Sequence, residues 1–197
     1  MESNAATLRL AAVPNAGRVA DVAWVGIGAA VIALSAQIAV ALPFTPVPIT
    51  GQTLSVLLVG AALGSVRGSA SAMLYVAVGA AGAPIYAQAA HGWGVLSGAT
   101  GGYLIALPLA AALTGFLAER GWDRRFSSAV GAMLTGNLVV YVVGLPWLAV
   151  VLGTNLEKTL EYGLYPFVPG DLFKLYLAAA LLPAAWRLAG RKRDDLR

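Results

Sequence analysis

The 197-residue chain contains no cysteine and only one histidine. Without cysteine there is no disulfide framework, no cysteine-ligated zinc or iron–sulfur site and no thiol catalysis. The single histidine, His91, has no acidic neighbour in the sequence, so we expect neither a metal site nor a cofactor. Charge is also scarce, because Asp, Glu, Lys and Arg together make up only 11% of the residues.

Apolar residues dominate the composition. They make up 59% of the chain, and the mean hydropathy is +0.77. A soluble globule of this size needs more polar surface than such a composition supplies. The length allows about six spans of roughly 20 residues each. We therefore predict an all-α membrane protein surrounded by membrane lipid, a six-transmembrane-helix bundle over residues 21–188, with a cytoplasmic lead-in (1–20) and a basic cytoplasmic tail (189–197).

Motifs for several other functions are missing. The sequence has no GxxxxGK[ST] loop for nucleotide phosphates, no HExxH and no GxSxG elbow. We therefore predict that the chain is not an enzyme and does not hydrolyse ATP by itself. The net charge of +4 comes from basic residues at the ends of apolar segments, where they act as topology signals, so we expect no nucleic-acid partner.

Glycine and proline divide the apolar sequence into its expected spans. These are 21–42, 53–63, 69–79, 103–117, 127–152 and 171–188, with residues 64–68 forming a turn. The second and third segments are shorter than a comfortable span, so a tilted or partly re-entrant helix is expected there.

The distribution of Lys and Arg predicts the orientation. On this map, all of these residues except Lys158 and Lys174 fall on one side, which puts both termini in the cytoplasm. The proline-rich segment 43–52, the glycine-rich segment 80–102 and the approach to Asp171 then all face outward. Their convergence predicts a binding pocket on the external side.

Asp171 and Lys174 follow two prolines and a glycine at the start of the last span. Their i, i+3 spacing puts both side chains on one face of that helix. A capping Asp with a Lys that snorkels to the headgroups is the simpler interpretation. Together with the outward-facing loops, the pair predicts the polar end of the pocket.

Other polar groups lie at membrane depth or beside it. Asn137 and Tyr141 share a helical face, and Trp147 follows them, while Thr50 and Gln52 end the proline-rich segment. Polar groups at this depth are costly unless they pair inside the bundle, which makes them candidates for the site. Hydrogen bonding between helices is the alternative for Asn137.

Two further features concern helix ends and faces. The run before the fourth span would offer free backbone N–H groups to a carboxylate, at Thr100, Gly101 and Gly102. On the first span, Ala29 and Ala33 stand four residues apart, as do Gly26 and Ala30. Such small-residue strips let another helix approach closely, either from a partner or from within the bundle.

Three blocks of sequence carry a family resemblance. They are VPITGQTLSVLL (47–58) with GATGGYL (98–104), GN with YxxGxxW (136–147), and PFxPGDxxKxxLA (166–178). Together they resemble the BioY family, the biotin-specific substrate-capture (S) components of energy-coupling factor (ECF) transporters. In the GATGGYL run, Ala99 stands where family members often have proline.

The resemblance implies a six-helix bundle that binds biotin with high affinity from outside, in the cytoplasmic membrane of a prokaryote. It also implies two kinds of partner, a transmembrane coupling (T) protein and two ABC-type ATPases, with Ala29 and Ala33 in the docking position. Two alternatives stay open: capture of another vitamin, or a self-sufficient secondary transporter of a small amphipathic solute.

For biotin, we expect Asp171 to accept from a ureido N–H, Asn137 to complement the ureido edge, and Lys174 to bind the ureido carbonyl or balance Asp171. The N-terminal backbone of the fourth span would then meet the carboxylate. The reverse orientation, with Lys174 on the carboxylate, is also open. The expected aromatic walls are Tyr103, Tyr141 and Trp147.

Overall fold

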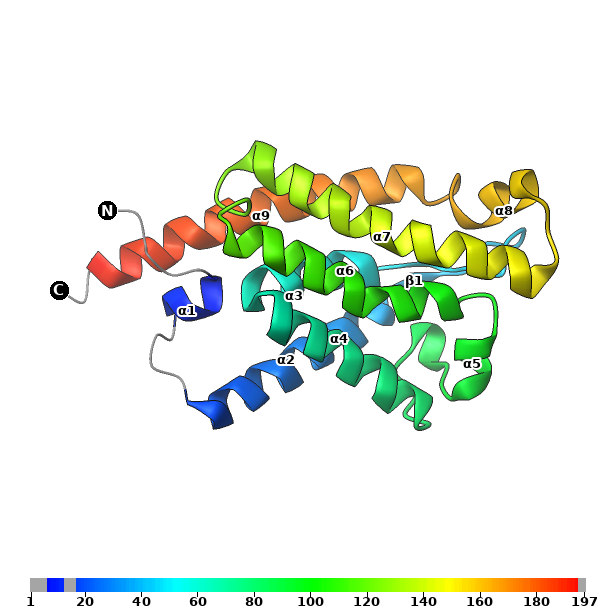
Figure 1. Cartoon of the computed structure of the whole chain (residues 1–197), viewed down its shortest axis with the longest axis horizontal. Coiled ribbons are helices and arrows are strands. Elements are labelled where there is room, and N and C mark those ends of the chain that lie inside the picture. Colours follow the sequence, from blue (N-terminus) through cyan, green and yellow to red (C-terminus); the bar gives the residue numbers. More distant parts are fainter. Residues whose placement is uncertain (1–6, 13–16, 195–197) are drawn as a thin grey trace.

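The computed structural model describes residues 7–12 and 17–194, with side chains described as far as Ala189 except that of Ala12. Most of it is helical (Figure 1). The α-helices are α1 (Leu8–Ala12), α2 (Arg18–Ala36), α3 (Gln52–Leu63), α4 (Ser65–Ala80), α5 (Trp93–Ser97), α6 (Gly101–Glu119), α7 (Phe126–Leu152), α8 (Leu156–Gly163) and α9 (Val168–Asp194). A 3-10 turn, η1 (Ala87–Ala89), and two short strands, β1 (Ala39–Val40) and β2 (Ile49–Thr50), complete the described elements.

Four of the described helices, α2, α6, α7 and α9, are long and apolar enough to cross a membrane. Helix α3 is apolar but has only 12 residues, and α4 has 16. The predicted class, a helical membrane protein, is therefore confirmed. As expected, the second and third predicted spans, which are α3 and α4, are shorter than the other four.

The first long helix ends earlier than the sequence pattern predicts. Residues 37–42 were expected to continue the span, but α2 ends at Ala36. The chain then pairs antiparallel with β2, with Ala39 opposite Thr50. The N–H of Gly51 also donates to the carbonyl oxygen of Ile38 at 2.9 Å. The hairpin thus satisfies backbone groups that the helix would otherwise have used.

The turn between the second and third predicted spans is also shorter than predicted. Gly64 alone separates α3 from α4, with a positive φ of 87° that glycine adopts without strain. Glu119, at the end of α6, then caps α4. Its Oε1 accepts from the N–H and the hydroxyl of Ser65, at 2.8 and 3.0 Å. A carboxylate is favourable at a helix N-terminus, so α4 begins four residues before the predicted start.

The predicted lead-in is partly helical. It contains α1 and the first turn of α2, while residues 1–6 and 13–16, like 195–197 of the predicted tail, lie outside the described part. Asp21 accepts from two arginines, Arg9 of α1 and Arg67 of α4, the latter at 2.8 Å. These ion pairs tie α1, α2 and α4 together at one end of the molecule.

Helix α6 lies at the centre and packs against α3, α4 and α7. Small residues let α3 approach both α6 and α4 closely. A Cβ added to Gly60 would lie 2.5 Å from the carbonyl oxygen of Ala111, and one added to Gly68 would lie 2.6 Å from the Cα of Gly60. Such contacts between small residues are the usual basis of helix association in membranes.

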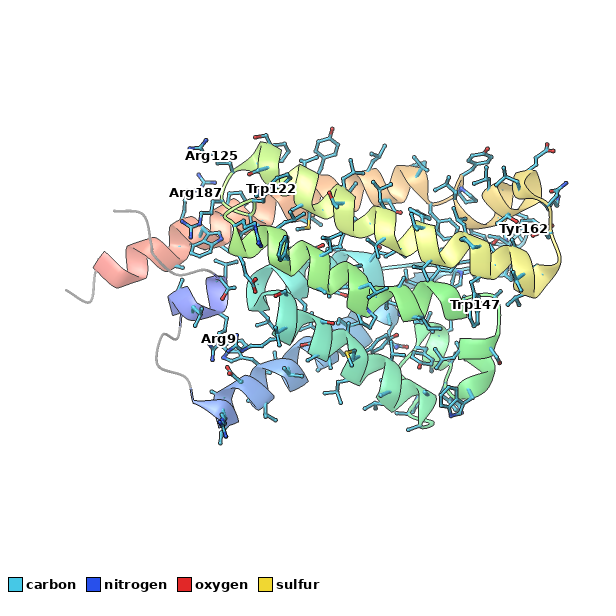
Figure 2. The ribbon with its side chains drawn as sticks, viewed as in Figure 1. Arg9, Trp122, Arg125, Trp147, Tyr162 and Arg187 are labelled. Carbon is cyan, nitrogen blue, oxygen red and sulfur yellow. The ribbon has the colours of Figure 1, made fainter. Side chains whose placement is uncertain are left out.

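The two ends of the bundle differ in character (Figures 1 and 2). Helix α1 and the last turns of α9 lie at one end, together with Arg9, Arg125 and Arg187. Helices α5 and α8 lie at the other end, near Trp147 and Tyr162. The fold therefore gathers these arginines at the end opposite to α5 and α8.

Candidate ligand-binding site

A cavity of about 310 Å³ lies toward the α5 and α8 end of the bundle. Its walls come from the proline-rich segment, the start of α3, residues 86–90, residues 95–100 and the first turns of α6 and α9. Val140, Tyr141 and Phe167 complete it. The three outward-facing segments of the predicted topology therefore meet around one cavity.

Asp171 forms the polar centre of this site. The residue is only 6% exposed. Asn137 Nδ2 donates to Oδ2 at 3.1 Å, and the hydroxyl of Tyr141 donates to the same oxygen. Lys174 Nζ donates to Oδ1 at 3.0 Å. The two helical pairs expected from the sequence, one on α7 and one on α9, thus form a single cluster.

Lys174 also reaches across to α3. Its Nζ lies 3.2 Å from the hydroxyl oxygen of Thr53, and both residues line the cavity. Since Asp171 and Lys174 carry opposite charges, the cluster is neutral overall. Each charge has a partner, which is the condition for keeping charged groups inside a membrane protein.

Thr50 and Gln52 line the cavity beside this cluster. The hydroxyl of Thr50 donates to Gln52 Oε1 at 3.0 Å, and Gln52 Nε2 donates to the hydroxyl of Tyr75 at 2.6 Å. These bonds hold the Gln52 carboxamide in one orientation. The predicted polar contribution of the proline-rich segment therefore lies in the same cavity as Asp171.

Aromatic rings form part of the remaining wall. Tyr103 and Tyr141 meet edge to face, with ring centroids 6.5 Å apart. The Tyr103 hydroxyl donates to the carbonyl oxygen of Gly163 at 3.1 Å, which fixes its ring against α8. Both tyrosines line the cavity, as does Phe167.

Four predicted site residues lie outside the lining, namely Asn137, Trp147, Gly101 and Gly102. Trp147 donates from Nε1 to the carbonyl oxygen of Gly98 at 2.9 Å and supports the cavity wall from behind. Gly101 and Gly102 pack against Trp147, and a Cβ on Gly102 would overlap its side chain. The N–H of Gly101 is already bonded to the Gly98 carbonyl, at 3.1 Å. Of the three residues predicted at the start of the fourth span, only Thr100 lines the cavity.

Asn137 also stands behind the lining, where it contacts Asp171. Ala29 and Ala33 lie away from the cavity. Ala29 is 9% exposed and belongs to the apolar core, and Ala33 packs against that core. Gly26 and Ala30, the second small pair of α2, are the more exposed pair.

Sequence reasoning missed several lining residues. Thr53 directly follows Gln52 in the VPITGQT block, and Phe167 precedes Asp171 in the PFxPGD block, so position within a motif could have indicated both. Tyr86 and Gln88 carry no such signal, because their place depends on how the glycine-rich segment folds. Among the described residues, no group of three His, Cys, Asp or Glu side chains could hold a metal ion.

The fold and the site together define a class: a multi-pass helical membrane protein with a cavity whose polar end is a neutral acid–base cluster. Residues 4–191 match the model of the BioY family. The chain belongs to that family.

Similar proteins include transporters from bacteria and archaea. A probable biotin transporter BioY of Pyrococcus horikoshii is 37% identical over 170 residues, covering 86% of this chain and 96% of the relative. The biotin transporter BioY of Rhizobium etli is 33% identical, covering 78% and 85%. A crystal structure of the S-component for biotin from an ECF-type ABC transporter superposes with a TM-score of 0.75 at 26% identity, covering 87% and 91%. These relatives are transporters and not enzymes.

Proposed function

We propose that this chain captures biotin from the external side of a prokaryotic cytoplasmic membrane, as the substrate-specific subunit of an ECF-type ABC transporter. The observation that carries the proposal is the Asp171 cluster at the polar end of a cavity of about 310 Å³ in a BioY family member. A cavity of this size suits a small vitamin.

The cluster has hydrogen-bonding capacity left for a ureido ring. A carboxylate offers about four acceptor positions, and three protein donors use Asp171. An ammonium group has three donors, and Lys174 directs two of them to Thr53 and Asp171. One acceptor and one donor thus remain for a ureido N–H and the ureido carbonyl.

Charge supports this orientation of the ligand over the reverse one. The ureido ring is neutral and suits the neutral Asp171–Lys174 pair, whereas a ligand carboxylate would face the Asp171 charge. The carboxylate would extend to Thr100, where the N-terminus of α6 favours an anion. In this arrangement Asn137 acts through Asp171, Trp147 supports the wall, and Gly101 and Gly102 let α6 pack closely behind Thr100.

The proposed topology has six spans, formed by α2, α3, α4, α6, α7 and α9, with both termini cytoplasmic. Twelve residues of helix reach only about 18 Å, less than the roughly 30 Å of a hydrocarbon core. Most of α3 is nevertheless buried between other helices. Its short length is therefore compatible with a place inside the bundle.

Transport would require the T protein and two ABC-type ATPases, because the chain has no nucleotide loop of its own. For docking, we keep α2 as the proposed contact element. Ala29 and Ala33 are the pair expected from the family resemblance. The burial of Ala29 makes packing within the bundle a competing role for that pair.

A ligand panel tests the function directly. The melting temperature of the purified protein would be measured with biotin, biotin methyl ester, riboflavin and thiamine. We expect a clear rise with biotin, because a ligand that binds only the folded state stabilises it, and a smaller rise with the ester. A rise with riboflavin or thiamine alone would indicate another vitamin, and uptake by proteoliposomes without ATPases would indicate a secondary transporter.

A further inference from the structure

Gln37 follows the last turn of α2 and contacts a segment far away in the sequence. Its Nε2 lies 3.1 Å from the carbonyl oxygens of Ile85 and Tyr86 and also from that of Ala33 in α2, so two N–H groups are shared among three acceptors. Its Oε1 accepts from the N–H of Ala89 at 3.2 Å. A single exposed carboxamide therefore bonds both sides of the segment 85–90, which we call the cover segment.

The cover segment forms a wall of the cavity. Tyr86, Ala87, Gln88 and Ala90 all line it. The ring of Tyr86 occupies the space that a side chain at residue 79 would fill, and its hydroxyl donates to the Val76 carbonyl at 2.6 Å. The segment is thus anchored to α4 at its start.

The middle of the cover segment has an unfavourable backbone. Gln88 and Ala89 have φ values of 59° and 57°, in the left-handed region that residues with a Cβ rarely adopt. Such backbone persists only where its surroundings hold it. The bond from Ala89 N–H to Gln37 lies at this point, and the bond from Tyr86 N–H to the Ala90 carbonyl, at 3.1 Å, closes the segment on itself.

We propose that Gln37 is a positioning residue that holds the cover segment in place over the cavity and thereby sets how fast a bound ligand leaves. Gln37 itself does not line the cavity, so it acts through the segment's backbone. The inference rests on the proposed function only in that biotin is the probe for one of its two tests.

The first test measures dissociation of labelled biotin from the full chain. Gln37→Ala removes the bonds to Ile85, Tyr86 and Ala89, and we expect roughly tenfold faster dissociation, since these bonds are neutral. Gln37→Glu keeps an acceptor for Ala89 but places a negative charge beside the two carbonyl oxygens. Dissociation from this variant should be at least as fast as from Gln37→Ala. Leu34→Ala, an exposed position one turn earlier, is the matched control and should match wild type.

A third substitution separates positioning from general stability. Ala89→Gly removes the cost of the left-handed backbone, because glycine adopts positive φ readily. In the Gln37→Ala background it should recover part of the slow dissociation. A role of Gln37 confined to the end of α2 would leave the double variant as fast as Gln37→Ala.

The second test needs no ligand. Since the chain has no cysteine, Ala87→Cys places one thiol on the partly buried inner side of the cover segment. Its reaction with a maleimide should be several-fold faster when Gln37→Ala is added, and unchanged when Leu34→Ala is added.

The two tests distinguish this inference from the proposed function. Wild-type dissociation in both Gln37 variants, with wild-type labelling of Ala87→Cys, would overturn the positioning role. A wild-type protein that binds no biotin would count against the proposed function alone, and the labelling rate would then decide the role of Gln37.

Discussion

At the scale of single residues, Asp171 is the centre of the site because three side chains converge on it from two helices. Asn137 and Tyr141 bind one of its oxygens, and Lys174 binds the other. Removing the charge would leave Lys174 without its ionic partner in a partly buried position, and an unpaired charge away from water is costly. The four residues should therefore behave as a unit when they are substituted.

The first prediction concerns this unit. Asp171→Asn and Lys174→Ala should each weaken biotin binding about tenfold to a hundredfold, the range expected for a lost hydrogen bond to a charged group. The measurement is equilibrium binding of labelled biotin to the purified variants. Glu157→Gln, an exposed acid on α8, is the control for the loss of a charge. Unchanged affinity in both site variants would disprove the assignment.

A second buried acid, Asp123, lies outside the proposed spans, in the turn between α6 and α7. Trp186 donates to its Oδ2 at 2.6 Å, while Oδ1 is buried and has no hydrogen-bond partner among the residues that the structure describes. Burial raises the pKa of Asp123 to about 6. The folded protein therefore holds this proton more tightly than the unfolded chain does.

The second prediction follows from the sign of that shift. The stabilisation from neutral Asp123 is fully present below the ordinary pKa of 3.8 and is lost as the pH rises through about 6. Between pH 5 and 7 the melting temperature of wild type should fall relative to that of Asp123→Asn, which cannot ionise. Parallel pH profiles for the two proteins would show that Asp123 does not titrate in this range.

At the scale of elements, α2 shows why equal spacing does not imply equal roles. The pairs Ala29–Ala33 and Gly26–Ala30 look alike in the sequence. In the fold, Ala29 is buried in the core, while a Cβ on Gly26 would meet no described atom within 4 Å. The rotation of α2 against its neighbours separates an inward strip from an outward one.

The third prediction uses bulky substitutions on both strips. Ala29→Leu should lower the melting temperature and biotin binding together, because overpacking a tight contact typically costs about 1–3 kcal/mol. Ala30→Leu should leave both unchanged. Co-purification of each variant with the T protein and the ATPases then measures docking. Intact folding and binding in Ala29→Leu with lost co-purification would instead assign docking to the Ala29–Ala33 strip.

At the scale of the whole molecule, the cavity and the arginine-rich end lie apart along the length of the bundle. The cavity lies toward α5 and α8, and Arg9, Arg125 and Arg187 gather at the opposite end (Figure 2). This polarity matches the excess of basic residues that marks a cytoplasmic side. It would place ligand entry and the arginine-rich end on opposite faces of the membrane.

The fourth prediction tests this orientation with single cysteines in the cysteine-free chain. Glu157→Cys on α8 should react with a membrane-impermeant maleimide in intact cells. Ser127→Cys, near the start of α7, should react only after the cells are permeabilised. Both positions are exposed, so accessibility within the fold does not decide the result. The opposite labelling pattern would reverse the proposed topology.

The sequence by itself determined the membrane class, the helical content, most helix positions and many of the polar residues at the cavity, because hydropathy, proline and helical spacing act locally. It identified Asp171 with Lys174, and Asn137 with Tyr141, as pairs on their own helices. It could not show that the two pairs meet, since they lie 30 or more residues apart in the sequence.

Only the tertiary structure decided the contacts between distant segments. Packing brought Lys174 to Thr53, turned Trp147 behind the cavity wall and buried Ala29. It also ended α2 at Ala36, because the backbone beyond it pairs with residues 49–51 and Gln37 bonds to residues 85–89. Such choices depend on which surfaces fit together, and no local pattern contains that information.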